Sequence, residues 1–219
     1  MLLNEWSFII AISNYQPHTD SNAMKTKNKE KYCRIIQAAT KIFAKKGFFQ
    51  AKVSDIAREA QVADGTIYLY FQNKDDILIS LFEENMQIVL EDMKAAIASE
   101  KDPCRKIERF AQKHLELIES NKDIAEVIQV ELRQSSKFMK EYDNEKFSQY
   151  LNLLGDIILE GQEKGFFKKD IIPGIAKRAL FGALDEMSRY WVLSSRRKYG
   201  IETAAKQVSE YFLNGLTAR

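Results

Sequence analysis

Apolar residues recur three or four positions apart along most of the chain, and the alternation typical of strands is almost absent. The first such stretch predicts a helix over 27–46, with Gly47 at the position that commonly follows a helix. A later helix is expected to run towards Ser99, and Pro103 suits the first turn of the next. The remaining helices are expected from Asn121 through Leu132, from about Ser136 to a stop at Gly165, from Pro173, and from Ile201 to Leu216. The pattern predicts an all-α protein.

Two short helices joined by a tight turn follow the first helix. The first starts near Ser54, which is the first residue able to cap it, and the turn lies at Gln61. The second begins near Asp64, and a capping box of Asn73 and Asp76 then starts the helix that leaves this unit. Two short helices crossed at such a turn form the helix-turn-helix unit, whose second helix enters the major groove of DNA.

Charge is distributed unevenly along the chain. The whole chain carries a net +2, whereas residues 24–73 carry +6 and residues 74–219 carry −2. Basic charge therefore gathers where the helix-turn-helix lies, as expected of a segment that meets phosphates. The lysines between 25 and 31 fit that interpretation and a solvated helix start about equally well.

Composition argues against several other classes of function. The two cysteines and two histidines supply neither a disulfide framework nor a closely spaced metal-ligand cluster, and they suggest a reducing cytoplasm. The apolar run 8–12 is too short to span a bilayer and has no basic residue before it, so it predicts neither an anchor nor a signal peptide. Ser21-Asn22-Ala23 resembles a tag-cleavage scar, so residues 1–23 are expected to be a non-native extension.

The run from Val62 to Leu78, VADGTIYLYFQNKDDIL, resembles the end of the DNA-binding domain of the TetR family of bacterial one-component repressors. The family likeness covers about 27–76. Within that family, the chain is similar to the FadR-type, acyl-CoA-responsive regulators of fatty acid degradation in DGTIYLYFQNKDDILISLF, ELRQSS and FGALDE. The resemblance implies a three-helix DNA-binding domain at 24–73 and a helical effector-binding and dimerisation domain at 74–219.

The resemblance also implies which residues contact DNA. Those expected at phosphates are Ser54, Thr66, Tyr68 and Lys74, with Gly65 allowing close approach of the backbone. Those expected at base edges are Ala63 and Leu69, against thymine methyl groups, and Asp64, which can accept from cytosine N4. Hydroxyl and ammonium contacts to phosphate give affinity and register, whereas the base contacts would give sequence preference.

Three residues depart from the usual family pattern. Gln61 stands where glycine is usual, which predicts strain if its φ is positive. Ala63 replaces a frequent capping Ser or Thr, so Asp64 is expected to cap the second helix, a role favoured over base readout because phosphates repel a carboxylate. Packing is the expected role of Tyr70 and Phe71, and also of Phe48 and Phe49.

For the effector, the resemblance implies a long-chain acyl-CoA held by the helices between 74 and 165, with an apolar tunnel and a basic mouth. The candidate mouth residues are Arg105, Arg109, Arg133, Arg178 and Arg189. The candidate tunnel residues are Phe110, Leu115, Ile128, Phe138, Tyr142, Leu154, Phe181 and Trp191. Arg133 stands out amid apolar residues, although a salt bridge to Asp185 or Glu186 explains it equally well. His114 is expected to be a satisfied core residue.

The same resemblance implies a homodimer on palindromic operator DNA, paired through the last two helices, with Trp191 and Phe212 as candidate anchors. The implied function is repression of fatty acid degradation genes, relieved by acyl-CoA. A repressor of efflux genes that senses a hydrophobic, drug-like cation is the alternative. An acyl-handling enzyme finds little support, because the chain shows no nucleophile elbow or phosphate-binding glycine loop. A plain helical interaction module leaves the basic clustering unexplained.

Overall fold

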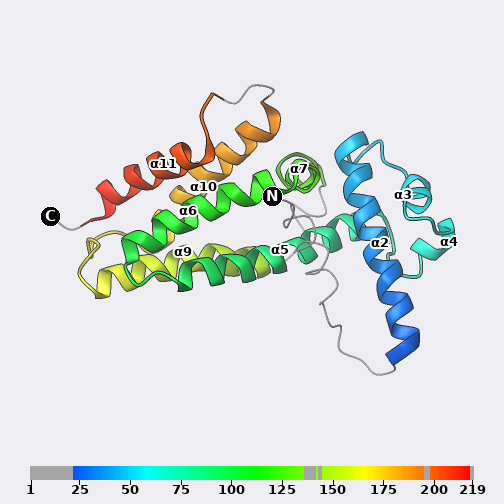
Figure 1. Ribbon diagram of the computed structural model, residues 1–219, viewed down its shortest axis with the longest axis horizontal. Coiled ribbons are helices and arrows are strands. Elements are labelled where there is room, and N and C mark those ends of the chain that lie inside the picture. The colour runs from blue at the N-terminus through cyan, green and yellow to red at the C-terminus, as the bar shows by residue number, and fades with distance from the viewer. Residues whose placement is uncertain (1–21, 136–141, 143–144, 195–197, 218–219) are drawn as a thin grey trace, which may run out of the picture. The chain divides into compact units, whose positions relative to one another are not determined.

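The computed structural model describes residues 22–135, 142, 145–194 and 198–217. These residues are mostly helical and form no named strand, which confirms the all-α prediction (Figure 1). The helices in chain order are α2 (Asn22–Lys46), α3 (Val53–Glu59), α4 (Asp64–Ile67), α5 (Lys74–Ala98), α6 (Pro103–Ser120), α7 (Lys122–Glu126), η1 (Val127–Glu131), η2 (Leu132–Gln134), α9 (Glu145–Glu163), α10 (Pro173–Leu193) and α11 (Ile201–Leu216).

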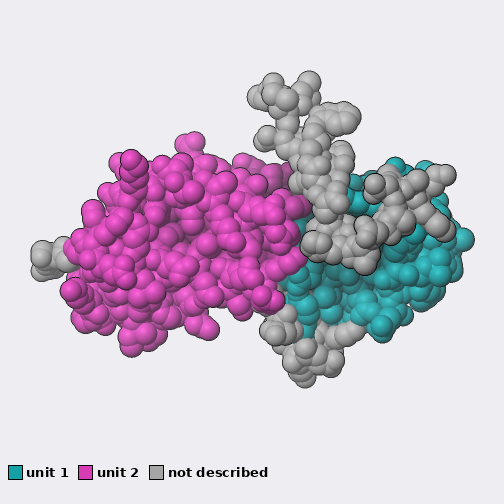
Figure 2. Space-filling model, turned by 90° about the horizontal axis from the view of Figure 1, so that it is seen from below, with its two compact units in different colours: residues 1–85, 123–142 teal, residues 86–122, 143–219 magenta. Residues whose placement is uncertain are grey.

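Contacts divide the chain into two compact units (Figure 2). Unit 1 holds the described residues up to Asn85 and those of 123–142, and unit 2 holds the described residues of 86–122 and 143–219. The first turns of α5 and the segment after Lys122 therefore pack with the N-terminal helices. The units do not coincide with a division at residue 73, and the functional division of the chain there stays a prediction. Residues 1–21 lie outside the described residues.

Several helices begin or end at a glycine, proline or capping residue, as the sequence predicted. Gly47 follows α2 with φ +77° and Gly165 follows α9 with the same φ, a left-handed conformation that favours glycine. Pro103 is the first residue of α6, and Asp102 caps that helix by accepting a hydrogen bond from the Cys104 N–H at 2.7 Å. These features confirm the predicted ends of α2 and α9 and the predicted start of α6, whereas α2 begins at Asn22, earlier than predicted.

The predicted helix from Asn121 through Leu132 is not regular. It begins as α7, widens into the π-helical η1 and tightens into the 3₁₀-helical η2. Its polar residues Gln129 and Glu131 are buried. A π-helical turn is rare and often marks a functional site. The helix predicted from about Ser136 is described from Glu145 onward, and its expected start lies outside the described residues.

Each unit has its own apolar core. A fully buried Phe, Leu or Ile contributes roughly 1.5–3 kcal/mol, so these residues dominate the stability of each unit. In unit 1 the buried residues include Ile35, Phe43, Ile56, Ile67, Ile77 and Leu81. In unit 2 they include Ile107, Phe110, Leu115, Leu154, Ile158, Leu180 and Leu184, where α6 contacts α9, α10 and α11. α10 also contacts α9 and α11 (Figure 1).

The turn between α3 and α4 contains a strained residue. Gln61 has φ +54° and an exposed side chain, as its replacement of the usual glycine predicted. Left-handed backbone costs an L-residue roughly 1–2 kcal/mol, part of which glycine's larger unfolded-state entropy offsets. Gln61→Gly is therefore expected to raise the free energy of unfolding by about 1 kcal/mol, measured by urea denaturation.

The control is Gln149→Gly, which changes an exposed glutamine inside α9. The free energy of unfolding of this variant should fall by about 1 kcal/mol, because glycine is unfavourable in a helix interior. Equal losses in both variants would show that the conformation of Gln61 is not strained.

Candidate functional site

The start of α3 is held by an ionic cluster. Its N-cap is Lys52, so the capping role expected of Ser54 is wrong, and Ser54 lies exposed in the first turn. The Asp55 carboxylate accepts from the Lys52 N–H at 3.3 Å and pairs with Lys46 at 2.8 Å and Arg58 at 2.6 Å. The hydrogen bond from Lys46 holds the pKa of Asp55 below its ordinary value. The cluster joins the end of α2 to α3.

The start of α4 lacks a side-chain cap. Ala63 occupies the N-cap position with extended φ and ψ, and Asp64 is the first helical residue. The capping role expected of Asp64 is therefore wrong, because the chain enters the helix one residue earlier. After Ile67 the chain continues as a turn, with the Tyr70 N–H donating to the Ile67 carbonyl at 3.0 Å.

The residues expected to meet DNA gather on and around α4. Ile67 is buried and fixes the helix against unit 1, whereas Tyr68 and Leu69 are 58% and 81% exposed. The other predicted contacts on α4 and its cap are exposed at Ala63, Asp64 and Gly65 and half-buried at Thr66. The C-cap residue Tyr68 and the following Leu69 thus expose a phenol and an apolar side chain just after α4. Their contact with DNA stays a prediction.

Packing accounts for the residues just after that surface. Phe71 is buried and stacks on Tyr32 at 5.5 Å between ring centroids, and the half-buried Tyr70 donates to Asn28 at 3.3 Å. Both residues therefore pack within unit 1, which confirms that prediction. Phe48 is also buried, but Phe49 is exposed, so the packing role expected of Phe49 is wrong.

The start of α5 has the predicted cap and also a lysine that binds the α2–α3 loop, which was not predicted. Asn73 caps α5 by accepting from the Asp76 N–H at 2.9 Å, as predicted. The Lys74 ammonium donates to three backbone carbonyls of the α2–α3 loop, those of Phe48 at 2.5 Å, Phe49 at 3.1 Å and Ala51 at 3.1 Å. It also lies 4.5 Å from the centre of the Phe48 ring, and burial lowers its pKa. Its expected phosphate contact stays a prediction.

A buried carboxylate also forms a hydrogen bond with the α2–α3 loop. Glu131, at the end of η1, accepts from the Phe48 N–H at 2.5 Å and is only 6% exposed. Ser135 donates to Asp75 in the first turn of α5 at 2.6 Å. The segment 127–135 thus contacts both the loop that precedes the helix-turn-helix and the helix that follows it. Sequence reasoning missed these contacts, because no local pattern links residues so far apart.

Aromatic side chains from three helices meet in unit 2. Phe110 and His114 come from α6, Phe147 and Tyr150 from α9, and Phe181 from α10. The closest rings are Phe110 with Tyr150 and Phe147 with Phe181, both 5.1 Å apart. His114 is buried, with Nδ1 2.7 Å from the Tyr150 hydroxyl. Its Nε2 has no hydrogen-bond partner among the described residues, so the expectation of a fully satisfied core residue is wrong. This aromatic cluster contains two of the predicted tunnel residues, Phe110 and Phe181.

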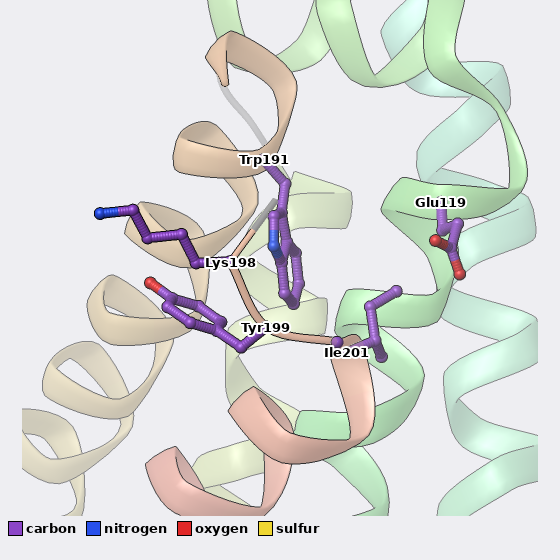
Figure 3. A pocket seen from close by; sticks show the side chains of 6 residues that line it. Glu119, Trp191, Lys198, Tyr199 and Ile201 are labelled. Carbon is purple, nitrogen blue, oxygen red and sulfur yellow. The ribbon is translucent and has the colours of Figure 1, made fainter. Parts of the chain in front are cut away.

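The remaining predicted tunnel residues are dispersed. Leu115, Leu154 and Trp191 are buried in unit 2, so the role of dimer anchor expected of Trp191 is wrong. Ile128 and Tyr142 are half-buried in unit 1, and Phe138 lies outside the described residues. Trp191 instead borders a hollow of about 350 Å³, where Figure 3 shows its ring between Tyr199 and Glu119.

Carboxylates on their own helices already pair several of the candidate arginines. Arg105 pairs with Glu108 at 2.8 Å, and Arg109 lies 3.8 Å from Glu116. Arg189 pairs with Glu186 at 2.7 Å. Arg133 donates a hydrogen bond to Gln129 at 3.3 Å, and Arg178 donates one to the Gly174 carbonyl at 3.2 Å. Binding of CoA phosphates at any of the paired arginines would have to compete with these carboxylates.

Two classes of site are not seen in the described parts of the chain. No group of His, Cys, Asp and Glu side chains there is arranged to hold a metal ion. Within those same ranges, no helix is both long and apolar enough to cross a bilayer.

Known proteins share both halves of this architecture. Residues 35–81 match the family described as "Bacterial regulatory proteins, tetR family", and residues 82–215 match "YsiA-like protein, C-terminal region". The Bacillus subtilis (strain 168) fatty acid metabolism regulator protein is 39% identical over 193 residues, 88% of this chain and 98% of that protein. The chain therefore belongs to the TetR family of bacterial regulators.

Two solved structures are also similar over most of the chain. The fatty acid degradation regulator FadR from Bacillus halodurans superimposes with a TM-score of 0.79 at 37% identity, covering 92% of this chain and 100% of that one. FadR from Bacillus subtilis, solved in complex with stearoyl-CoA, superimposes with a TM-score of 0.78 at 39% identity. The match covers 84% of this chain and 98% of that one. The resemblance to FadR-type regulators is thus confirmed.

Proposed function

We propose that the protein is a dimeric transcriptional repressor of fatty acid degradation genes that leaves its operator when long-chain acyl-CoA binds. The observation that carries the proposal is 39% identity to a fatty acid metabolism regulator over nearly all of both chains. A related FadR structure holds stearoyl-CoA, and aromatic side chains of α6, α9 and α10 gather in unit 2 of this chain. The protein is then a binding protein of the cytoplasm rather than an enzyme.

The DNA contact is assigned to α4 and its flanks. Buried Ile67 fixes the end of α4, Tyr68 and Leu69 are exposed directly after it, and residues 24–73 supply a net +6. Phosphate contacts give affinity that falls with salt, and base contacts in the major groove give sequence preference. Of the residues proposed here, Tyr68 and Leu69 are the large side chains that are more than half exposed and so available to DNA.

The dimer is assigned to α10 and α11. Ile172 and Ile175 are more than 60% exposed, and exposed Ala179 and Gly182 continue their stripe along α10. Small residues let two helices approach closely, and the large apolar ones would be buried by a second copy. A two-fold pair then presents two copies of α4 to half-sites about 34 Å apart, as a palindromic operator requires.

The effector and the DNA would communicate through the segment 127–135. This segment contains two candidate ligand residues, Ile128 and Arg133. Its Glu131 accepts a hydrogen bond from the α2–α3 loop. An effector that repositions the segment would shift the loop and with it the start of the helix-turn-helix. A 100-fold preference of the effector for the released state corresponds to about 2.7 kcal/mol.

The proposal is tested by selecting duplexes from fragmented genomic DNA of the source bacterium with the purified protein. Enriched fragments should share a palindrome and lie upstream of fatty acid degradation genes. Binding of the selected duplex, measured by fluorescence anisotropy, should weaken steeply between about 50 and 200 mM salt. Enrichment of efflux-gene promoters would instead support the drug-sensing alternative, and no enrichment at all would overturn the proposal.

A further inference from the structure

His114 is buried with half of its hydrogen-bonding capacity unused. The residue is 8% exposed, and Nδ1 lies 2.7 Å from the Tyr150 hydroxyl. Nε2 has no hydrogen-bond partner among the described residues. An unsatisfied buried polar group costs about 1–3 kcal/mol, so its retention calls for a physical reason.

Aromatic side chains surround His114, and its imidazole is a polar group among them. Phe110 stacks on the imidazole and Phe181 meets it edge-on, at 6.4 and 5.7 Å between ring centres. Phe181 is half-buried, so the cluster is not sealed at α10. Asp185, one turn further along α10, lies near enough to act electrostatically on His114.

The imidazole is neutral at physiological pH. Burial lowers the pKa of His114 to about 4, against the opposing effect of Asp185. Burial also raises the pKa of Tyr150 well above its ordinary value, so its hydroxyl keeps its proton and can donate it to Nδ1. The tautomer that accepts at Nδ1 carries its hydrogen on Nε2, the side of the ring that has no hydrogen-bond partner among the described residues.

We infer that the Nε2–H of His114 donates a hydrogen bond to a neutral carbonyl oxygen of the bound effector, making His114 a specificity-determining residue. This inference rests on the proposed function, because acyl-CoA is the effector considered. The carbonyl is that of the thioester or of the neighbouring pantetheine amide. A free fatty acid is disfavoured, because its carboxylate would meet a neutral imidazole beside the negative Asp185.

The experiment compares palmitoyl-CoA with S-hexadecyl-CoA, a thioether that lacks the acyl carbonyl, by isothermal titration at pH 7.5. His114→Phe should bind palmitoyl-CoA about 10-fold more weakly than the unchanged protein, the loss expected for one hydrogen bond in an apolar site. His114→Gln, which keeps a donor near the same place, should stay within about 3-fold. Palmitate should bind at least about 10-fold more weakly than palmitoyl-CoA.

The thioether then identifies the carbonyl. If the thioester is the acceptor, the unchanged protein binds S-hexadecyl-CoA about 10-fold more weakly than palmitoyl-CoA, and His114→Phe has no further effect on it. If the pantetheine amide is the acceptor, His114→Phe weakens both ligands equally. Unchanged palmitoyl-CoA affinity in His114→Phe would overturn the inference while leaving the proposed function standing. Failure of the unchanged protein to bind palmitoyl-CoA would overturn the effector assignment and the inference together.

A second measurement needs no substitution. ¹⁵N NMR of the unchanged protein at pH 7.5 should show the His114 ring with its hydrogen on Nε2. A ring protonated on Nδ1 would overturn the inference, because Nε2 could then only accept.

Discussion

Ile175→Glu is expected to convert the dimer to monomers and to weaken operator binding by about 1,000-fold, because one helix-turn-helix alone contacts only one half-site. Ile175 is 65% exposed near the start of α10, in line with exposed Ala179 and Gly182. In a two-fold interface each substitution occurs twice, so two carboxylates would be buried without partners. Analytical ultracentrifugation and anisotropy with the selected duplex measure the two effects.

The matched control is Leu159→Glu, which places the same charge at an exposed apolar residue of α9. It should leave both the dimer and the operator affinity within about 2-fold of the unchanged protein, because it lies outside the proposed interface. An Ile175→Glu protein that stayed dimeric at micromolar concentration would place the interface elsewhere.

Glu131→Ala is expected to uncouple the effector from DNA. Removing the carboxylate leaves the Phe48 N–H without its buried acceptor, which costs about 2 kcal/mol of stability. The segment 127–135 also loses this hydrogen bond to the α2–α3 loop. The roughly 100-fold effect of palmitoyl-CoA on operator affinity should therefore fall below about 10-fold. Urea denaturation and operator titrations with and without palmitoyl-CoA measure the two changes.

Two neighbouring substitutions separate the contact from a general loss of charge. Glu131→Gln keeps an acceptor oxygen and should retain most of the stability and most of the coupling. Glu126→Ala removes a nearby carboxylate, whose pKa burial raises, from the same stretch of chain and should leave the coupling intact. Full coupling in Glu131→Ala would show that the effector reaches the DNA-binding helices by another route.

Local chemistry explains which parts of the fold the sequence predicted. Gly47, Pro103 and Gly165 each set a helix boundary through their own backbone preferences, and Asn73 does so by a hydrogen bond three residues away. Long-range contacts explain the failures. The π-helical η1 is accompanied by a buried Glu131 whose partner lies 83 residues earlier, and no periodicity in the sequence signals such a contact.

In the candidate sites, too, local features were predictable from the sequence and long-range contacts were not. The exposed residues on and just after α4 could be proposed from the sequence, because the signature from Val62 to Leu78 resembles that of a known family. The tunnel was predictable only in part, because helical spacing identifies apolar faces without saying which of them meet. Phe110 and Phe181 do join one aromatic cluster, whereas Trp191 borders a separate hollow. The hydrogen bonds from Lys74 to the α2–α3 loop could not be predicted from the sequence, because a lysine at a helix start is usually solvated.

The most direct test of the account is an anisotropy titration of the selected duplex, bound to the unchanged full-length protein, with palmitoyl-CoA. Release of the duplex, with operator affinity falling about 100-fold at saturating ligand, is the predicted result. An operator affinity that palmitoyl-CoA leaves unchanged would contradict it.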